Sequence, residues 1–283
     1  MMAMLLACGT DNPTKDRVPD VGRGWSQLAP ATEPFLCGVW SDGEATCSGD
    51  ARPDLMTLPE DESWMLLALG YTHGCGLKLD GTARCWGESD YGQADPPEGT
   101  FVDIATSYYA SCGIHDDGTL ACWGDDDHGQ DAPPSGSEWV DVDMGYATAC
   151  ALSASGDVAC WGADSDNRTN APDGPWAALS MGNSVGCALA KDGAIACWGS
   201  DVYDVQLPPS GAFTELAAGW HAACALDAQG VATCWGADAG LGRSPPEAMS
   251  GLVGGDAWFC GYDARSNIRC FGKEAPTPPE EPS

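Results

Sequence analysis

Cysteine thiols are the most reactive groups in this 283-residue chain, which contains 15 of them. Fourteen fall into seven pairs with the same ten-residue step. Zinc sites favour cysteines two to four residues apart, with thiolate or imidazole partners. The ten-residue step does not match this spacing, and the chain has only four histidines to supply imidazole ligands. The alternative chemistry is disulfide formation, which belongs to an oxidising compartment. The pairs are Cys37/Cys47, Cys75/Cys85, Cys112/Cys122, Cys150/Cys160, Cys187/Cys197, Cys224/Cys234 and Cys260/Cys270.

Each cysteine pair brackets a turn. Six copies carry an X-Gly dipeptide midway between the cysteines, as in Asp80-Gly81, and this is a hairpin signal. A three-residue loop with Gly81 in the left-handed conformation places Cys75 opposite Cys85 at a non-hydrogen-bonded position. There the Cα atoms approach to about 4.5 Å, within the range of a disulfide. We therefore expect one disulfide inside every hairpin, and a looser turn in the last copy, where residues 265–267 lack glycine.

Other reactive side chains form no clear centre in the sequence. The histidines occupy unrelated repeat positions, at His73, His115, His128 and His221. Acidic clusters at 125–127 and 164–166 offer the oxygens that calcium prefers, but their spacing is not repeated, and solvated loops are the alternative interpretation. We expect no catalytic residue, no cofactor and no bound metal.

The cysteine pairs recur every 36 to 38 residues, so the chain is built from seven repeats. A large apolar residue stands eleven positions before the first cysteine in most copies, for example Trp64, and glycine follows at Gly70. Each repeat therefore predicts three strands, the last ending in Cys-Trp-Gly in five copies. Because side chains alternate along a strand, Trp86 and its equivalents should face the disulfide side of a neighbouring sheet.

Seven small sheets buried on both faces predict an all-β, seven-bladed β-propeller over residues 24–271, with about three antiparallel strands in each blade. Each blade would be contiguous in sequence, and face packing between the first and last blades would close the ring. The alternatives are a β-helix, which needs more uniform rungs, and a string of independent modules, which are too small to hold a core.

The repeat resembles that of the regulator of chromosome condensation family. The clearest copies are Asp80–Gly87 followed by Gly92-Gln93, and Asp117–Gly124 followed by Gly129-Gln130. The resemblance implies a seven-bladed propeller, and the short repeats are similar to a bacterial, secreted branch that includes a propeller inhibiting β-lactamases by binding them. Paired cysteines depart from the nuclear members. Nucleotide exchange and chromatin binding are not carried over, since a net charge of −30 would repel nucleic acid.

Both ends of the chain carry separate signals. Residues 1–8 end in Leu-Leu-Ala-Cys, which resembles a bacterial lipobox and marks Cys8, the one unpaired cysteine, for lipidation. The stretch before it is short for a signal peptide and contains no Lys or Arg, so a chance match is the alternative. We expect residues 9–23 to form a tether and the Pro/Glu-rich residues 272–283 to be disordered and dispensable for ring closure.

One turn position gathers aromatic residues, four before the first cysteine. In a propeller such positions surround one mouth, and aromatic side chains dominate binding hot spots. These rings could instead pack over neighbouring blades. The candidate binding residues are Tyr71, Tyr108, Tyr146, Asn183, Trp220 and Asp256, with Tyr109 and Trp258 close by.

These features predict a non-catalytic binding scaffold that holds a protein partner at one mouth. We expect a monomer in the bacterial cell envelope, either lipid-anchored or secreted, with no nucleic-acid ligand, and the acidic loops favour a basic partner. The alternatives are a hydrolase or lyase acting on envelope polysaccharide and a purely structural envelope protein. An enzyme should break the repeat with a polar cluster at one mouth, and we identify no such cluster in the sequence.

Overall fold

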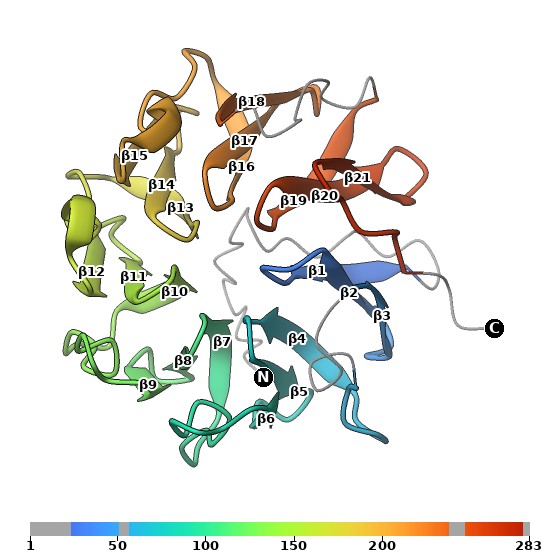
Figure 1. Ribbon diagram of the computed structural model, residues 1–283, viewed down its shortest axis with the longest axis vertical. Coiled ribbons are helices and arrows are strands. Elements are labelled where there is room, and N and C mark those ends of the chain that lie inside the picture. The colour runs from blue at the N-terminus through green and yellow to red at the C-terminus, as the bar shows by residue number, and fades with distance from the viewer. Residues whose placement is uncertain (1–23, 51–56, 238–246, 280–283) are drawn as a thin grey trace, which may run out of the picture.

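The computed structural model describes residues 24–50, 57–237 and 247–279. These residues form seven separate three-stranded antiparallel sheets, and each sheet uses strands that are consecutive in sequence. The sheets stand as blades around a central axis, with the first strand of each blade innermost (Figure 1). The expected seven-bladed, all-β propeller with contiguous blades is confirmed.

The blades are numbered one to seven along the chain. The inner strands are β1 (Trp25–Pro30), β4 (Trp64–Leu69), β7 (Phe101–Thr106), β10 (Trp139–Met144), β13 (Trp176–Met181), β16 (Phe213–Ala218) and β19 (Met249–Gly254). The middle strands are β2 (Phe35–Trp40), β5 (His73–Lys78), β8 (Ala110–His115), β11 (Thr148–Ser153), β14 (Val185–Ala190), β17 (Ala222–Asp227) and β20 (Trp258–Asp263). The outer strands are β3 (Ala45–Gly49), β6 (Ala83–Gly87), β9 (Leu120–Gly124), β12 (Val158–Gly162), β15 (Ile195–Gly199), β18 (Ala232–Gly236) and β21 (Ile268–Gly272). Two short 3-10 turns, η1 (Ser165–Asn167) and η2 (Val202–Asp204), follow β12 and β15.

The middle and outer strands carry the disulfides in the predicted register. Cys75 pairs directly with Cys85, and their Cα atoms are 4.0 Å apart. All seven blades form the same bond, so the predicted pairing within hairpins is confirmed. The bonds are Cys37/Cys47, Cys75/Cys85, Cys112/Cys122, Cys150/Cys160, Cys187/Cys197, Cys224/Cys234 and Cys260/Cys270.

The two cysteines of each bond differ in burial. The first cysteine lies on a middle strand and is completely buried in every blade. The second lies on an outer strand and is only partly buried, so the expectation of sheets buried on both faces is corrected for the outer strands. These strands lie at the periphery of the ring, where neighbouring blades diverge (Figure 1). The partly buried cysteines are Cys47, Cys85, Cys122, Cys160, Cys197, Cys234 and Cys270.

The hairpin turns beside the disulfides also join neighbouring blades. The Gly81 carbonyl in the turn of blade two accepts a hydrogen bond from the Phe101 amide of blade three at 2.8 Å. The Gly118 carbonyl of blade three accepts one from the Trp139 amide of blade four at 3.3 Å. The turn glycine thus links consecutive repeats as well as shaping its own hairpin.

The expectation of a looser final turn is wrong. Ser266 takes the left-handed position with φ 61°, and the Asp263 amide still donates to the Asn267 carbonyl at 2.9 Å. The Asp263 carboxylate compensates for the missing glycine because it accepts hydrogen bonds from the Arg265 and Asn267 amides, at 2.8 and 2.9 Å.

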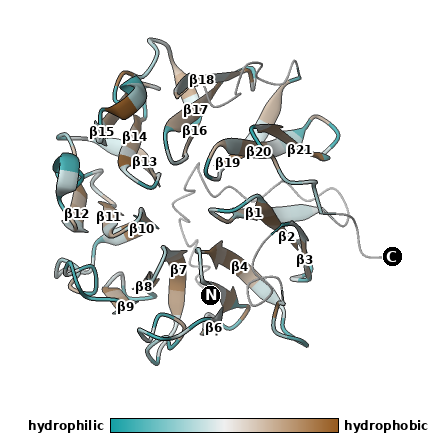
Figure 2. Ribbon diagram, viewed as in Figure 1, coloured by the Kyte–Doolittle hydropathy of each residue, from teal (hydrophilic) through white to brown (hydrophobic). Residues whose placement is uncertain are grey.

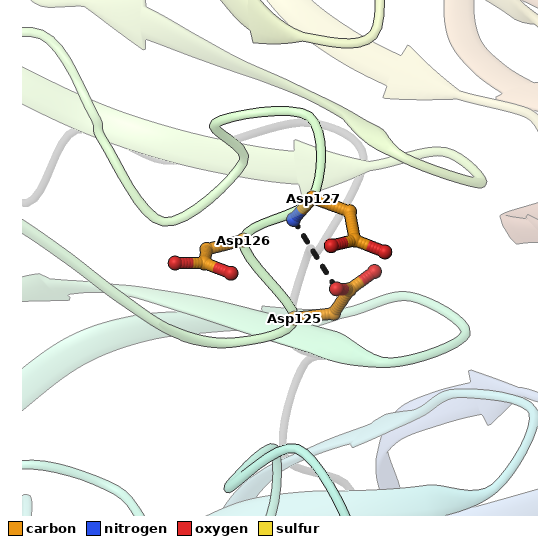
Figure 3. A group of neighbouring side chains, drawn as sticks. All are labelled: Asp125, Asp126 and Asp127. Carbon is orange, nitrogen blue, oxygen red and sulfur yellow. Dashed lines mark hydrogen bonds between the residues drawn. The ribbon is translucent and has the colours of Figure 1, made fainter.

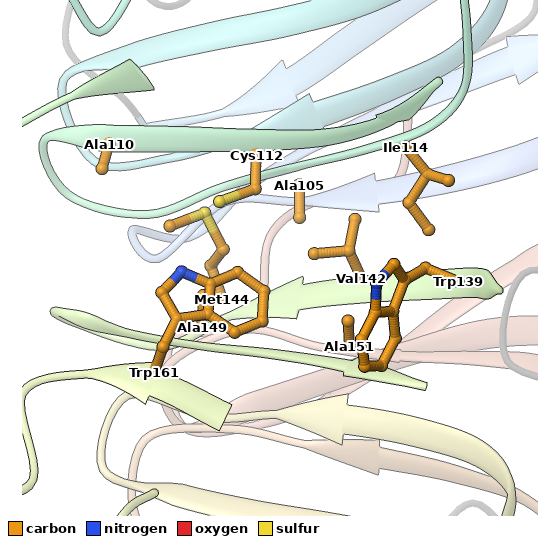
Figure 4. Close-up of a cluster of buried hydrophobic side chains, with 10 residues drawn as sticks. All are labelled: Ala105, Ala110, Cys112, Ile114, Trp139, Val142, Met144, Ala149, Ala151 and Trp161. Carbon is orange, nitrogen blue, oxygen red and sulfur yellow. The ribbon is translucent and has the colours of Figure 1, made fainter. Parts of the chain in front are cut away.

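The hydrophobic core lies between blades, because each sheet packs both faces against its neighbours. Between blades three and four, Trp161 packs in one cluster with Met144 and Cys112 (Figure 4). In six of the seven interfaces, an aromatic ring of the following blade's outer strand packs against the preceding blade's disulfide, as the alternation predicted. Hydrophobic colour accordingly follows the strands and hydrophilic colour the loops (Figure 2).

The seventh interface closes the ring. Trp25 and Trp40 of blade one stack with their ring centroids 3.7 Å apart, and both pack against Trp258 of blade seven. The expected closure by face packing between the first and last blades is confirmed. Blade one has Ser48 where five blades have tryptophan and blade seven has Phe271.

The segment after β21 is not the disordered tail that we expected, as far as residue 279. It passes from blade seven to blade one (Figure 1), and Ala275 packs against the closing cluster. The Ser48 hydroxyl donates a hydrogen bond to the Thr277 carbonyl, and Pro276 and Pro279 are buried. Residues 280–283 lie outside the described part of the chain, as do residues 1–23 with Cys8 and the expected tether.

Candidate binding mouth

The turns between inner and middle strands surround one mouth of the propeller. The Tyr146 amide donates to the Asn183 carbonyl of the next blade at 3.0 Å. The preceding glycine allows this approach, because a Cβ on Gly145 would lie only 2.6 Å from the Gly182 carbonyl oxygen. Backbone contacts between the turns of neighbouring blades thus hold the mouth in place. The side chains of these turns therefore project from fixed backbone positions.

The predicted ring residues differ in their accessibility. Tyr146 and Trp220 are exposed, at 44% and 38% of their full surface. Tyr71, Tyr108, Tyr109, Asn183 and Asp256 are partly buried. The exposed aromatic side chains therefore belong to the turns of blades four and six, while those of blades two and three are partly buried.

Tyr108 is the centre of an aromatic cluster on this mouth. Its ring stacks on Tyr71 and meets Tyr146 edge to face, with both centroid distances at 4.8 Å. The Asn183 side-chain amide donates to the Tyr108 hydroxyl at 3.2 Å, which ties blade three to blade five across the mouth. Tyr109 lies beside this cluster, 6.2 Å from Tyr108 between ring centroids. Tyr108 thus packs against rings of neighbouring blades, whereas Tyr146 keeps accessible surface.

Trp258 does not belong to the mouth, and its inclusion among the binding residues is corrected. Its side chain is 1% exposed and packs with Trp40 and Leu36 in the closing interface. Trp258 opens β20, where the residue faces the neighbouring blade rather than solvent.

Two hollows meet at the mouth. A central cavity of about 210 Å³ is lined by all seven inner strands and by Tyr108, Asn183 and Asp256 at its rim. A second hollow, which we call the Arg168 groove, has a volume of about 410 Å³. The residues that line the two hollows include no disulfide cysteine, so the disulfides support the fold and do not form part of the site. The groove is lined by Tyr108, Tyr146, Arg168, Asn183, Ser184, Ser200, Trp220 and His221.

Arg168 was missed in the sequence analysis, although the repeat offered a signal for it. The Trp198 indole donates to the Arg168 carbonyl at 2.9 Å, just as Trp161 donates to the Gln130 carbonyl at 3.0 Å. Arg168 therefore holds the repeat position of Gln93 and Gln130, where a glutamine would continue the pattern. Alignment of the repeat ends would have shown this change of charge.

Titratable groups on the mouth have shifted pKa values. Burial raises the pKa of Asp256 to about 6, the Glu274 carboxylate adds to this shift, and Lys273 opposes it. Burial also raises the pKa of Tyr108 and lowers that of His221. At neutral pH the phenol and the imidazole are uncharged, so Arg168 carries the permanent charge among the residues that line the groove.

The acidic cluster at 125–127 stabilises the turn in which it lies. The Asp125 carboxylate accepts hydrogen bonds from the Asp127 amide at 3.2 Å and from the Gln130 side chain at 2.9 Å. The three carboxylates lie close together, with one oxygen of each within 4.8 Å of the others (Figure 3). The cluster is the one group of three acidic or metal-binding side chains found among the described residues, and its hydrogen bonds explain Asp125 without an ion.

Residues 66–93, 101–130 and 139–168 match the regulator of chromosome condensation (RCC1) repeat. Three consecutive repeats of the chain, in blades two to four, thus match the RCC1 repeat. The matched segments end at Gln93, Gln130 and Arg168, which agrees with the equivalence of these positions in the structure. No curated protein matches the sequence.

Solved propellers share the fold of this chain at low sequence identity. The CRINKLY ectodomain of the Arabidopsis thaliana receptor kinase ACR4 is 20% identical, with a TM-score of 0.76, and the match covers 92% of this chain and 99% of that one. The Physcomitrella patens CR4 ectodomain is 21% identical, with a TM-score of 0.74 and coverage of 89% and 75%. Prp20p of Saccharomyces cerevisiae is 16% identical, with a TM-score of 0.70 and coverage of 99% and 91%.

Proposed function

We propose that this RCC1-repeat propeller is a non-catalytic scaffold that binds a protein partner at the mouth flanked by Tyr146 and Trp220. The observation that supports this proposal most is the exposure of both aromatic side chains on a locked backbone, next to the Arg168 groove. Rigid aromatic residues bury a large area with little loss of side-chain entropy, which is why they dominate binding hot spots.

Fold-level analogy adds limited support. Prp20p, the yeast RCC1, has binding properties toward Gsp1p and histones, and it has also been solved with Kap60 bound to it. Propellers of this shape thus hold protein partners, but function is set by individual sites rather than by a fold. The partners of those proteins are not carried over to this chain.

The location of the protein follows from its disulfides. Seven disulfides indicate an oxidising environment, either extracellular or periplasmic. Within the described ranges, no helix has the length and the apolar character needed to cross a bilayer. Lipidation at Cys8, export through the bacterial cell envelope, a monomeric state and a basic partner remain our proposals, supported by the sequence signals at the N-terminus and by the net charge of −30.

A capture experiment tests the proposed scaffold. Immobilised wild-type protein and the Trp220→Ala variant are incubated with envelope extract, and retained proteins are identified by mass spectrometry. The matched control is Leu79→Ala, because Leu79 is 65% exposed but lies at a hairpin turn at the opposite end of the strands. We expect one protein to be retained by wild type and Leu79→Ala and lost with Trp220→Ala. Equal retention by all three proteins would refute the mouth as the binding site.

A further inference from the structure

Arg168 has few partners for its charge. The side chain is 15% exposed, and its Nη2 lies 3.4 Å from the Asp166 carboxylate, a long contact to a side chain that is itself 56% exposed. The Nε–H is buried and has no hydrogen-bond partner among the described residues. A guanidinium carries five N–H donors, and buried donors without acceptors cost free energy. The group is therefore prepared for an acceptor that the folded chain does not supply.

Local backbone structure holds Arg168 in this place. Asp166 and Asn167 in η1 both adopt left-handed φ values, 63° and 59°, and the chain returns to a right-handed conformation at Arg168. The Arg168 carbonyl is fixed by the Trp198 indole at 2.9 Å. The position is thus set by the fold, and Arg168 lines the groove together with Tyr146 and Trp220.

We propose that the Arg168 groove recognises the carboxylate of one Asp or Glu side chain on the protein partner. This inference rests on the proposed scaffold function and specifies its chemistry. A guanidinium binds a carboxylate through two parallel charge-assisted hydrogen bonds. The exposed rings of Tyr146 and Trp220 offer walls for the methylene stem of that side chain, and Asn183, Ser184 and Ser200 add polar groups to the lining.

The charge of the whole chain selects the source of the carboxylate. A net charge of −30 repels acidic polymers and free acids, and it attracts a basic protein surface. Such a surface can bring a single acidic side chain to Arg168, which then fixes the orientation of the complex. An acidic polysaccharide would meet the same negative field along its whole length.

Peptide selection tests this proposal. The probe is a bead-displayed library of acetylated, amidated octapeptides that each contain two lysines, and a second library has free C-terminal carboxylates. The proteins are wild type, Arg168→Gln, Trp220→Ala and Arg84→Gln. The Arg168→Gln variant restores the residue found at positions 93 and 130, so its fold should persist, which a thermal melt checks. Arg84→Gln removes a positive charge from outer strand β6, where the side chain is 54% exposed.

We expect wild type and Arg84→Gln to select peptides from the amidated library with Asp or Glu at one position. Changing that acid to its amide should weaken binding to wild type by roughly tenfold or more, and should leave binding to Arg168→Gln unchanged. Peptides that need Trp220 but ignore Arg168 would overturn the carboxylate assignment and leave the scaffold intact. Selection from the free-terminus library alone, or tighter binding of oligogalacturonate than of any peptide, would overturn the assignment to an acidic side chain. Binding that is absent in wild type, or equal in Trp220→Ala, would overturn both proposals.

Discussion

His73 lies in the middle strand of blade two, completely buried, with its Nε2 2.7 Å from the Ser111 hydroxyl. Its Nδ1 has no hydrogen-bond partner among the described residues. Burial lowers the pKa of His73 to about 4, since a charged imidazolium would lose its hydration there. A buried neutral histidine of this kind contributes to packing between neighbouring blades.

The pH dependence of stability tests this burial. In the unfolded chain His73 takes up a proton near pH 6.5, whereas in the native protein it does so only near pH 4. Its contribution to the free energy of unfolding should therefore fall as the pH drops from 6.5 to 4, by roughly 3 kcal/mol in total. Urea unfolding at several pH values should show a shallower slope over this range in His73→Gln than in wild type. His128→Gln, at an exposed loop position, is the control, and identical slopes in all three proteins would contradict the account.

The inner turns show why the repeat keeps a glycine after its first strand. Gly182 lies so close to blade six that a Cβ would overlap the Gly219 carbonyl oxygen. Such contacts recur at Gly70, Gly145 and Gly219, so the requirement comes from the closeness of neighbouring blades rather than from backbone conformation. The sequence could indicate the glycine, but the reason for it depends on a neighbour 37 residues away.

Replacing Gly182 with alanine should force the turns of blades five and six apart. Because the obstacle is backbone, the clash cannot be relieved by a side-chain rotation, and we expect Gly182→Ala to lose about 3 kcal/mol or more of unfolding free energy. Gly211→Ala is the matched control, since Gly211 is exposed and a Cβ there would meet only the ring of Phe213 at 3.2 Å. Urea unfolding of both variants provides the comparison, and a loss below about 1 kcal/mol in Gly182→Ala would argue against tight turn packing.

The segment 272–279 lies at the interface between blades seven and one. At this interface the outer strand of blade one, β3, contributes no aromatic ring. Ser48 leaves a small side chain where blades two to six have tryptophan, and Ala275 with the buried Pro276 adds apolar surface at the closure. Composition alone could not reveal this role, because a Pro/Glu-rich tail is typical of disorder and its contact with Ser48 spans 229 residues.

Truncation tests whether this segment helps to close the ring. A chain that ends at Lys273 should lose roughly 2 kcal/mol from the removed apolar contacts. For a domain of this size that corresponds to a thermal midpoint about 5 °C lower. A chain that ends at Pro279 is the control and should melt like wild type. Equal midpoints for all three chains would show that face packing alone closes the propeller.

At the scale of the whole molecule, most of the architecture could be predicted because one pattern repeats seven times. The cysteine spacing determined hairpin register, and alternation then placed Trp86 against the disulfide of blade one. Deviations from the pattern were harder to interpret. Asp263 rescues the final turn through side-chain hydrogen bonds, and Trp258 is buried by a blade that is distant in sequence. The same holds for the mouth, where Arg168 stands in a position that glutamine occupies twice.

The proposed binding mouth requires Tyr146 and Trp220 to act as binding residues rather than packing residues. The direct test measures two quantities on Tyr146→Ala and Trp220→Ala, namely the affinity for the captured partner and the free energy of unfolding. We expect each change to weaken binding by roughly 2 kcal/mol or more. The unfolding free energy should change by less than about 1 kcal/mol, because both side chains are exposed. A stability loss of about 3 kcal/mol with unchanged affinity in the folded fraction would contradict the binding mouth.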